Sequence, residues 1–244
     1  MNLIIDIGNT RTKLAVFDNQ LLLHSTSVSK LKTEILETFL DRYPGLNNAI
    51  LSTVKDYPEE SNFFLQKKFE QFIELDHQTP VPIKNSYHTP ETLGLDRLAA
   101  VIGASSLFTD DNILVIDAGT AVTYDIIRNK EYLGGNISPG LEVRFKALNQ
   151  FTGRLPVVSK KSRFSKLGKN TESAIRAGVQ LGMIFEMEQM IEMFNESYKN
   201  LKVILTGGDA FFFDGKLKNT IFVQLYLSQI GLNQILLFNN RDLF

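Results

Sequence analysis

A short motif that occurs twice limits the folds open to this chain. Residues Leu3–Leu14 read LIIDIGNTRTKL, and residues Leu114–Asp125 read LVIDAGTAVTYD. In both, an apolar run typical of a strand ends in an aspartate, a glycine turn and a threonine, and a second such run follows. The matching surroundings indicate a divergent duplication, so we expect two α/β domains, residues 1–111 and 112–244, that face each other across a central cleft.

Both turns have the chemistry of a phosphate site. A glycine lets backbone N–H groups approach an anion without a Cβ in the way, and Thr10 and Thr120 add hydroxyl donors. The carboxylates of Asp6 and Asp117 are unfavourable beside phosphate unless a cation such as Mg²⁺ lies between them. Three further donors follow the first turn, namely Arg11, Thr12 and Lys13. An ordinary β-hairpin is the alternative, because Asp, Asn and Gly are common turn residues.

Composition excludes several other classes of protein. The chain has 244 residues, of which 43% are hydrophobic and 22% charged, as in a globular protein. It has no cysteine, which excludes disulfides, thiolate zinc sites and cysteine nucleophiles. A net charge of −1 gives no basic excess for nucleic acid, and three scattered histidines do not predict a metal site. We expect no membrane span and no signal peptide, hence a cytoplasmic protein.

The segment between the two repeats carries a candidate catalytic group. Residues Thr79–Arg97, TPVPIKNSYHTPETLGLDR, contain three prolines and no clear period, which predicts an ordered loop of functional importance. Asp96 in this loop is a candidate general base for an alcohol, and Arg97 could hold a substrate carboxylate or orient Asp96. The alternative is an acid at the start of the alanine-rich helix expected over Leu98–Phe108.

Two elements of the second repeat add to the pattern. A strand over Val203–Leu205 leads into Thr206-Gly207-Gly208-Asp209, where a nucleoside could lie against the backbone. A long helix is expected from Thr171 to about Asn195, and its methionines indicate core packing or a subunit contact.

These motifs, in this order, resemble the superfamily of actin, sugar kinases and heat-shock chaperone ATPases. Within it the chain resembles the type III pantothenate kinases over most of its length. The stretches that carry the resemblance are DIGNTRTKL, YHTPETLGLDR, DAGTAVTYD, GGNISPG, RLP, LGKNTESAIRAG and LTGGDA. The loop Tyr87–Arg97 is the most discriminating, since the glycine turns are shared across the superfamily. The resemblance implies an α/β fold of two duplicated ribonuclease H-like (actin-like ATPase) domains.

The resemblance also implies an activity and the residues that perform it. The expected reaction is ATP-dependent phosphorylation of pantothenate to 4′-phosphopantothenate, the first step of coenzyme A biosynthesis. Asp96 would be the proton acceptor, and Asp117 would bind a monovalent cation, K⁺ or NH₄⁺. The residues implied to contact pantothenate are Tyr87, Gly94, Leu95, Asp96, Arg97 and Thr171. Those implied to contact ATP are Asp6, Ile7, Gly8, Asn9, Thr10, Arg11, Thr12, Lys13 and Thr120.

Other readings of the sequence stay open at this point. The family resemblance implies a homodimer, and the balanced charge and the lack of a long apolar run predict no nucleic-acid or membrane partner. The alternatives are a kinase of another small alcohol and a non-catalytic nucleotide-binding regulatory factor. The segment Thr53-Val54-Lys55-Asp56 departs from the small, apolar segment usual in the family, which leaves the shape of that loop undetermined.

Overall fold

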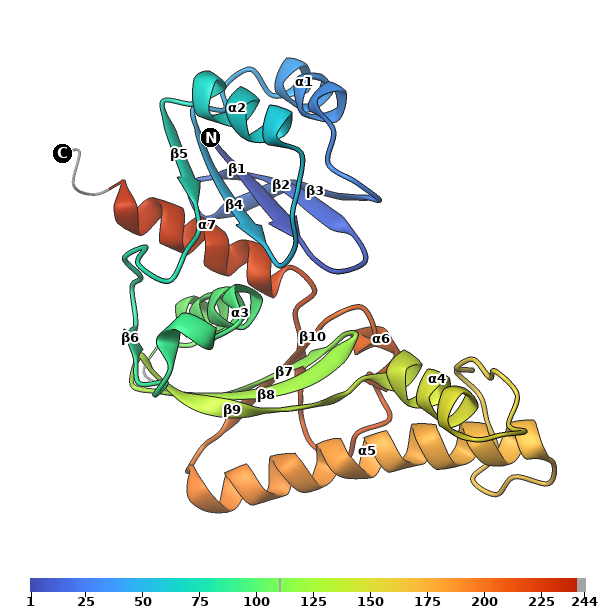
Figure 1. Cartoon of the computed structure of the whole chain (residues 1–244). Helices are drawn as coiled ribbons and strands as arrows, with labels where there is room; N and C mark the ends of the chain where they lie inside the picture. Colours follow the sequence, from blue (N-terminus) through green and yellow to red (C-terminus); the bar gives the residue numbers. More distant parts are fainter. Residues whose placement is uncertain (110, 241–244) are drawn as a thin grey trace. The chain divides into compact units, whose positions relative to one another are not determined.

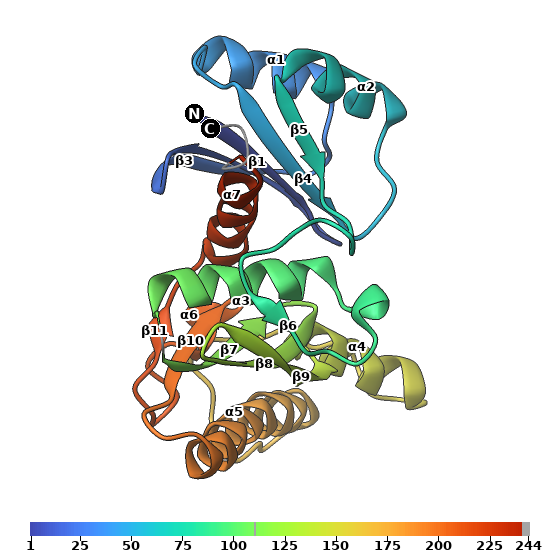
Figure 2. The same cartoon turned by 90° about the vertical axis from the view of Figure 1, so that its left-hand side faces the viewer.

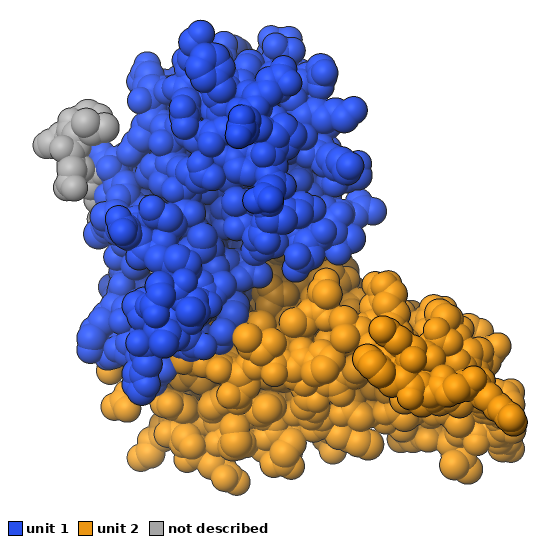
Figure 3. Space-filling model, viewed as in Figure 1, with its two compact units in different colours: residues 1–110, 130–133, 226–244 blue, residues 111–129, 134–225 orange. Residues whose placement is uncertain are grey.

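The computed structural model describes residues 1–109 and 111–240, and its chain packs into two compact units. Unit 1 comprises residues 1–110, 130–133 and 226–244, and unit 2 comprises residues 111–129 and 134–225 (Figure 3). The division at residue 111 expected from the repeat stays a prediction, because packing units need not coincide with duplicated segments.

Unit 1 is built on a five-stranded sheet in the order β3-β2-β1-β4-β5 (Figure 1). The central strand β1 pairs antiparallel with β2 and parallel with β4, and all of its residues are buried. The strands are β1 (Asn2–Ile7), β2 (Thr12–Asp18), β3 (Leu21–Val28), β4 (Asn48–Thr53) and β5 (Gln71–Glu74). The register of β1 against β2 places Asp6 opposite Lys13.

Helices cover both faces of this sheet (Figures 1 and 2). Helices α1 (Thr33–Arg42) and α2 (Glu59–Lys68) share one hydrophobic core with β1, β2 and β4. On the other face, α7 (Leu227–Asn239) packs against β1 and β4, and α3 (Leu95–Leu107) packs against α7. The backbones of α3 and α7 are in contact, since a Cβ on Gly231 would lie 1.7 Å from the carbonyl oxygen of Ala99.

Unit 2 holds most of a second sheet, whose order is β11-β10-β7-β8-β9-β6. Its strands are β6 (Lys84–Asn85), β7 (Asn112–Ala118), β8 (Ala121–Arg128), β9 (Glu131–Pro139), β10 (Lys202–Thr206) and β11 (Phe222–Val223). Strand β6 and the first residues of β9 belong to unit 1. The helices of unit 2 are α4 (Leu141–Phe151), α5 (Thr171–Ser197) and α6 (Ala210–Phe213). The long helix α5 lies along one face of the sheet, where Tyr124 of β8 donates a hydrogen bond of 2.9 Å to Glu186.

Helix α5 is the long helix expected from the sequence. It begins at Thr171 behind a capping box, in which the Asn170 side chain accepts a hydrogen bond from the Ser173 N–H. In the described part of the chain, no helix combines the length and apolar character that a membrane crossing requires.

Candidate active site

The first glycine turn lies in unit 1, between β1 and β2. The N–H of Gly8 donates to the carbonyl oxygen of Arg11 at 3.1 Å, which closes the loop Gly8–Arg11. Asp6 is the penultimate residue of β1, its carboxylate is buried, and the Lys13 ammonium lies 3.9 Å from it. Burial raises the pKa of the Asp6 carboxyl above its ordinary value of 3.8; Lys13 lowers this pKa, and the nearby carboxylate of Asp96 raises it. Asp6 and Asp96 are therefore brought close together within one unit.

The segment that departs from the family pattern contacts this turn. The Lys55 ammonium donates a hydrogen bond of 3.1 Å to the carbonyl oxygen of Asn9. The hydroxyl of Thr53 accepts from the backbone N–H of Lys55 at 3.1 Å, which bends the chain after β4. Lys55 thus fixes one backbone group of the turn, a contact that the sequence alone did not suggest.

The candidate base lies at the head of α3 rather than in an irregular loop. Gly94 is the N-cap residue, so Asp96 and Arg97 occupy the first helical turn, and the expected helix begins three residues before Leu98. The backbone N–H of Arg97 donates to Oδ1 of Asp96 at 2.8 Å. A Cβ on residue 94 would lie 2.6 Å from the same oxygen, so only glycine leaves room for this rotamer. The carboxylate is exposed and accessible to a substrate.

Arg97 is buried and held by two tyrosines. Its guanidinium carbon lies 5.7 Å from the centroid of the Tyr87 ring, and its Nη2 donates to the Tyr132 hydroxyl at 2.9 Å. The rings of Tyr87 and Tyr132 are stacked with centroids 6.0 Å apart. The predicted substrate residues Tyr87, Gly94, Leu95, Asp96 and Arg97 therefore form one cluster in unit 1.

The second glycine turn lies in unit 2, between β7 and β8. The N–H of Gly119 donates to the carbonyl oxygen of Ala121 at 2.9 Å. Helix α4 begins directly against this turn, because the N–H of its N-cap residue Gly140 donates to the Thr120 carbonyl at 3.0 Å. A Cβ on Gly140 would lie 2.1 Å from the Gly119 carbonyl oxygen. The helix N-terminus, where anions are favoured, is thus held at the turn by close backbone contact.

A glycine loop packs on the other side of the same turn. Gly207 follows β10 with φ of +94°, and a Cβ there would lie 2.4 Å from both Oδ1 of Asp117 and the carbonyl oxygen of Ala118. The N–H of Asp209 donates to that carbonyl at 2.9 Å. The strand end that was expected to accept a nucleoside therefore adjoins the predicted phosphate turn.

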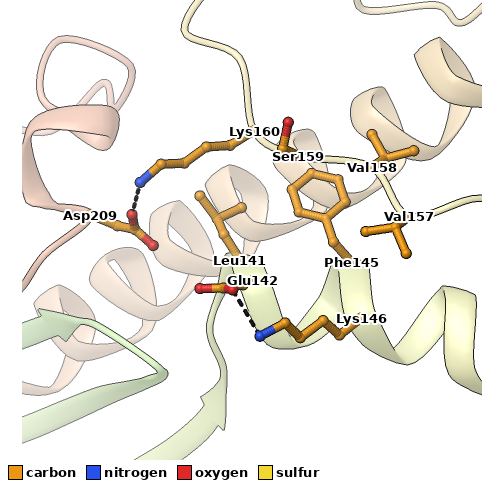
Figure 4. A pocket seen from close by; sticks show the side chains of 9 residues that line it. All are labelled: Leu141, Glu142, Phe145, Lys146, Val157, Val158, Ser159, Lys160 and Asp209. Carbon is orange, nitrogen blue, oxygen red and sulfur yellow. Dashed lines mark hydrogen bonds and ion pairs between the residues drawn. The ribbon is translucent and has the colours of Figure 1, made fainter. Parts of the chain in front are cut away.

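A pocket of about 310 Å³ opens beside this loop within unit 2 (Figure 4). Its apolar side chains come from α4 and from the segment that precedes α5, and its polar end is an ion pair between Lys160 and Asp209. A second ion pair on α4 joins Glu142 and Lys146 at 2.8 Å. The apolar lining residues are Leu141, Phe145, Val157 and Val158. The pocket suits a flat organic group, which would contact the apolar side chains and have charged side chains at its edge.

The structure separates the predicted residues by unit. Asp6–Lys13 and Tyr87–Arg97 lie in unit 1, whereas Asp117, Thr120 and Thr171 lie in unit 2. Thr171 is the exposed first residue of α5, and no contact described within unit 2 joins it to the turn. Sequence reasoning missed Lys160 and Tyr132, for which the sequence offered no signal beyond a basic run and an aromatic residue in a strand.

A metal cluster made of protein side chains is absent from the described residues. No group of three or more His, Asp or Glu side chains there could hold a metal ion. A cation at Asp117 would therefore take most of its ligands from phosphate oxygens, backbone carbonyls or water, which suits a hard cation such as Mg²⁺ or K⁺.

Comparison with solved structures defines the class of protein. An inorganic polyphosphate/ATP-glucomannokinase from Arthrobacter sp. strain KM matches 98% of this chain and 100% of its own, with 12% identity and a TM-score of 0.51. A Campylobacter jejuni protein assigned to the Baf family of transcriptional activators matches 97% and 98%, with 23% identity and a TM-score of 0.64. Such likeness shows the fold, which is that of the actin-like ATPases and sugar kinases, as the sequence predicted.

Sequence comparison then identifies the family. The family described as type III pantothenate kinase matches residues 2–193. A type III pantothenate kinase from Phocaeicola vulgatus is 49% identical over 242 residues, which cover 99% of this chain and 100% of the relative. The chain belongs to the type III pantothenate kinase family.

Proposed function

We propose that the protein transfers the γ-phosphoryl group of ATP to the hydroxyl of pantothenate, forming 4′-phosphopantothenate and ADP. Membership of the family supports this phosphotransferase activity and its place at the first step of coenzyme A biosynthesis. The observation that carries the proposal is Asp96, whose exposed carboxylate is fixed at the head of α3 in the same unit as the phosphate turn of Asp6.

The acceptor half of the reaction is assigned to unit 1. The pantothenate hydroxyl oxygen forms the new bond to the γ-phosphorus, the bond to the ADP oxygen breaks, and the hydroxyl proton passes to Asp96. Arg97 holds the carboxylate of pantothenate, since a guanidinium binds a carboxylate through two parallel hydrogen bonds. Tyr87, Gly94 and Leu95 line the same cluster.

The donor half is assigned to both glycine turns and to the pocket of unit 2. Backbone N–H groups of the turns, the hydroxyls of Thr10, Thr12 and Thr120, and the cation of Lys13 bind phosphate oxygens. The start of α4 favours the same anion. The pocket beside Gly207 receives the adenine ring against its apolar wall. Ile7, Gly8, Asn9 and Arg11 complete the ATP-binding set as backbone or flanking groups.

Cations are part of this proposal. We assign Asp117 to a monovalent cation, K⁺ or NH₄⁺, and expect Mg²⁺ to accompany ATP. When bound, the cations offset the charge of the polyphosphate. Asp117 Oδ1 lies against the backbone of Gly207, where a side chain on residue 207 would have no room. Asp6 gains from a cation as well, because a nearby positive charge favours the ionised form that burial disfavours.

Two further assignments concern Thr171 and assembly. We infer that the chain forms a cytoplasmic homodimer, with α5 contributing to the contact and Thr171 contacting pantothenate. The exposed apolar side chains of Phe151 and Leu167 near the start of α5 support an interface there.

The decisive experiment is a coupled assay of ADP release with pantothenate, in the presence and absence of K⁺. Pantothenate-dependent ADP formation with 4′-phosphopantothenate detected by mass spectrometry supports the proposal. ADP release that requires another small alcohol would move the assignment to that acceptor. ATP binding without any acceptor-dependent turnover would favour the regulatory factor.

A further inference from the structure

One buried tyrosine, Tyr132 on β9, touches both ends of the segment that carries the candidate acceptor site. Its carbonyl oxygen accepts from the N–H of Ser86 at 3.0 Å, and its ring stacks on Tyr87 at an interplanar angle of 13°. Its hydroxyl accepts from Nη2 of Arg97 at 2.9 Å. Tyr132 is fully buried, so these contacts are sheltered from water.

The hydroxyl of Tyr132 has a specific role among these contacts. A phenylalanine would give the same stacking and the same burial, so only the hydroxyl distinguishes tyrosine here. A buried hydroxyl must find a hydrogen-bond partner, and the partner in this case is a charged group whose direction matters. The Arg97 guanidinium lies over the ring of Tyr87, which restricts its movement on that side. The Tyr132 hydroxyl accepts a hydrogen bond from Nη2 at the edge of the guanidinium and restricts its rotation.

The position of Tyr87 does not depend on that hydroxyl. Strand β6 pairs parallel with the start of β9, and Lys84 of β6 forms a 2.7 Å ion pair with Glu131. The N–H of Tyr87 donates to the Asn85 side chain at 3.0 Å. Removing the hydroxyl alone therefore leaves Tyr87 in place and removes one hydrogen bond from the Arg97 guanidinium.

We propose that Tyr132 is a positioning residue, which orients Arg97 to bind the anionic end of the acceptor. This inference rests on the proposed function, because it takes Arg97 as the group that binds the carboxylate. An arginine side chain has many rotamers, and a bidentate hydrogen bond to a carboxylate tolerates little rotation. Tyr132 restricts those rotamers before the substrate arrives.

The test is Tyr132→Phe, with Tyr124→Phe as the matched control. Tyr124 is also fully buried and also loses a 2.9 Å hydrogen bond to a charged side chain, but it lies in unit 2. For Tyr132→Phe we expect the KM for pantothenate to rise about tenfold, equivalent to about 1.4 kcal/mol, with the KM for ATP unchanged. For Tyr124→Phe we expect a lower melting temperature and an unchanged KM for pantothenate.

A merely structural role would lower the melting temperature of both variants and leave the KM for pantothenate alone, which would overturn the inference. A KM for pantothenate raised equally in both variants would overturn it too. Hydrogen exchange of residues 86–97 adds a measurement that needs no turnover. Faster exchange near Arg97 in Tyr132→Phe alone supports the positioning role, and equal exchange in wild type and variant contradicts it.

The two proposals fail in distinguishable ways. If the wild type forms ADP with pantothenate but Tyr132→Phe keeps its KM, the function stands and the inference falls. If the wild type shows no turnover of pantothenate, the proposed function falls, and hydrogen exchange still decides whether Tyr132 orders Arg97.

Discussion

The two glycine turns are alike in sequence and differ in what surrounds them. The loop Gly8–Arg11 has four residues, whereas the second loop consists of Gly119 and Thr120 alone. A Cβ built on Gly8 would meet only the Arg11 carbonyl oxygen, at 3.4 Å, and one built on Gly119 would meet nothing closer than 3.5 Å. The second turn differs in its neighbours, because a Cβ built on Gly140 or Gly207 would lie 2.1–2.4 Å from atoms of residues 117–119. The first turn is therefore open and surrounded by charged side chains, and the second is closed by backbone.

This contrast separates the two predicted phosphate turns by what determines their geometry and charge. In unit 1, the pKa of Asp6 is set first by burial and then by the charges of Lys13 and Asp96, so electrostatics controls the site. In unit 2, glycine contacts fix the position of backbone groups, so steric fit controls the site. We therefore expect substitutions around the unit 1 turn to change mainly the activity, and substitutions around the unit 2 turn to change mainly the free energy of unfolding.

The largest effect expected on the acceptor side comes from Asp96→Asn. The amide cannot accept the hydroxyl proton, and general bases contribute about 100-fold to 10,000-fold to a rate. We expect kcat to fall within that range while ATP binding, measured by calorimetry, is retained. A turnover close to that of the wild type would remove Asp96 as the base.

The second prediction concerns the closed turn. Gly140→Ala places a Cβ against backbone oxygen, and we expect a loss of about 3 kcal/mol in the free energy of unfolding. Gly8→Ala should cost less than about 1 kcal/mol, because its Cβ meets one atom at ordinary contact distance. Urea unfolding of both variants measures the difference.

Gly153→Ala serves as the control for these substitutions. No atom lies within 4 Å of a Cβ built on Gly153, so this change should be neutral or add up to about 1 kcal/mol. Equal costs at Gly8 and Gly140 would show that the two turns do not differ in packing.

The third prediction uses the pKa of Asp6. Its folded-state pKa is raised from 3.8, so its contribution to stability is complete below that value and is lost as the pH rises through the folded-state pKa. At pH 7 the carboxylate destabilises the fold, and Asp6→Asn should raise the melting temperature while reducing activity. The gain in melting temperature of Asp6→Asn over the wild type should vanish as the pH is lowered towards 3.8.

The substitution Asp76→Asn, in the same unit, is expected to change the melting temperature in the opposite direction. A hydrogen bond from the Thr79 hydroxyl lowers the pKa of Asp76, so its carboxylate stabilises the fold at neutral pH. Its removal should lower the melting temperature at pH 7 slightly, because the residue is exposed. A melting temperature raised in both Asp6→Asn and Asp76→Asn would mean that burial of Asp6 is not the cause of the gain in Asp6→Asn.

The smallest effect is expected at Lys160. Exposed ion pairs contribute about 0–1 kcal/mol, so Lys160→Ala should raise the KM for ATP by less than about fivefold and leave the KM for pantothenate unchanged. Lys218→Ala is the control, since Lys218 pairs with Glu188 at 3.4 Å and does not line the pocket in Figure 4. A raised KM for pantothenate in Lys160→Ala would place the pocket on the acceptor side.

Much of the secondary structure was predictable because it depends on residues that are close in the sequence. The repeated strand–turn pattern predicted both hairpins, and the helices expected over Leu98–Phe108 and from Thr171 to about Asn195 are α3 and α5, with ends that differ by at most three residues. The alignment of Leu65, Phe69 and Phe72 predicts a helix over Phe64–Phe72, and this prediction is wrong. There α2 ends at Lys68, and Phe72 pairs in register with Ala49 of β4 as part of β5.

Contacts between distant residues were not predictable. The interaction of Tyr132 with Arg97 spans 35 positions, and the pairing of Lys160 with Asp209 spans 49. No local preference of either residue encodes such a contact. The sequence therefore predicted which residues carry chemistry, while the contacts of Tyr132 and Lys160 appeared only in the fold.

The close crossing of α3 and α7 has a consequence for how the chain is made. Helix α7 comes from the end of the sequence, yet it supplies fully buried side chains, among them Leu232, Ile235 and Leu236, to the unit that contains the N-terminus. During synthesis, unit 1 cannot complete its core until residue 239 has left the ribosome, whereas all residues of unit 2 have been made by residue 225. A stop codon before α7 would therefore leave unit 1 without a helix of its core and would expose the face of α3 that packs on α7.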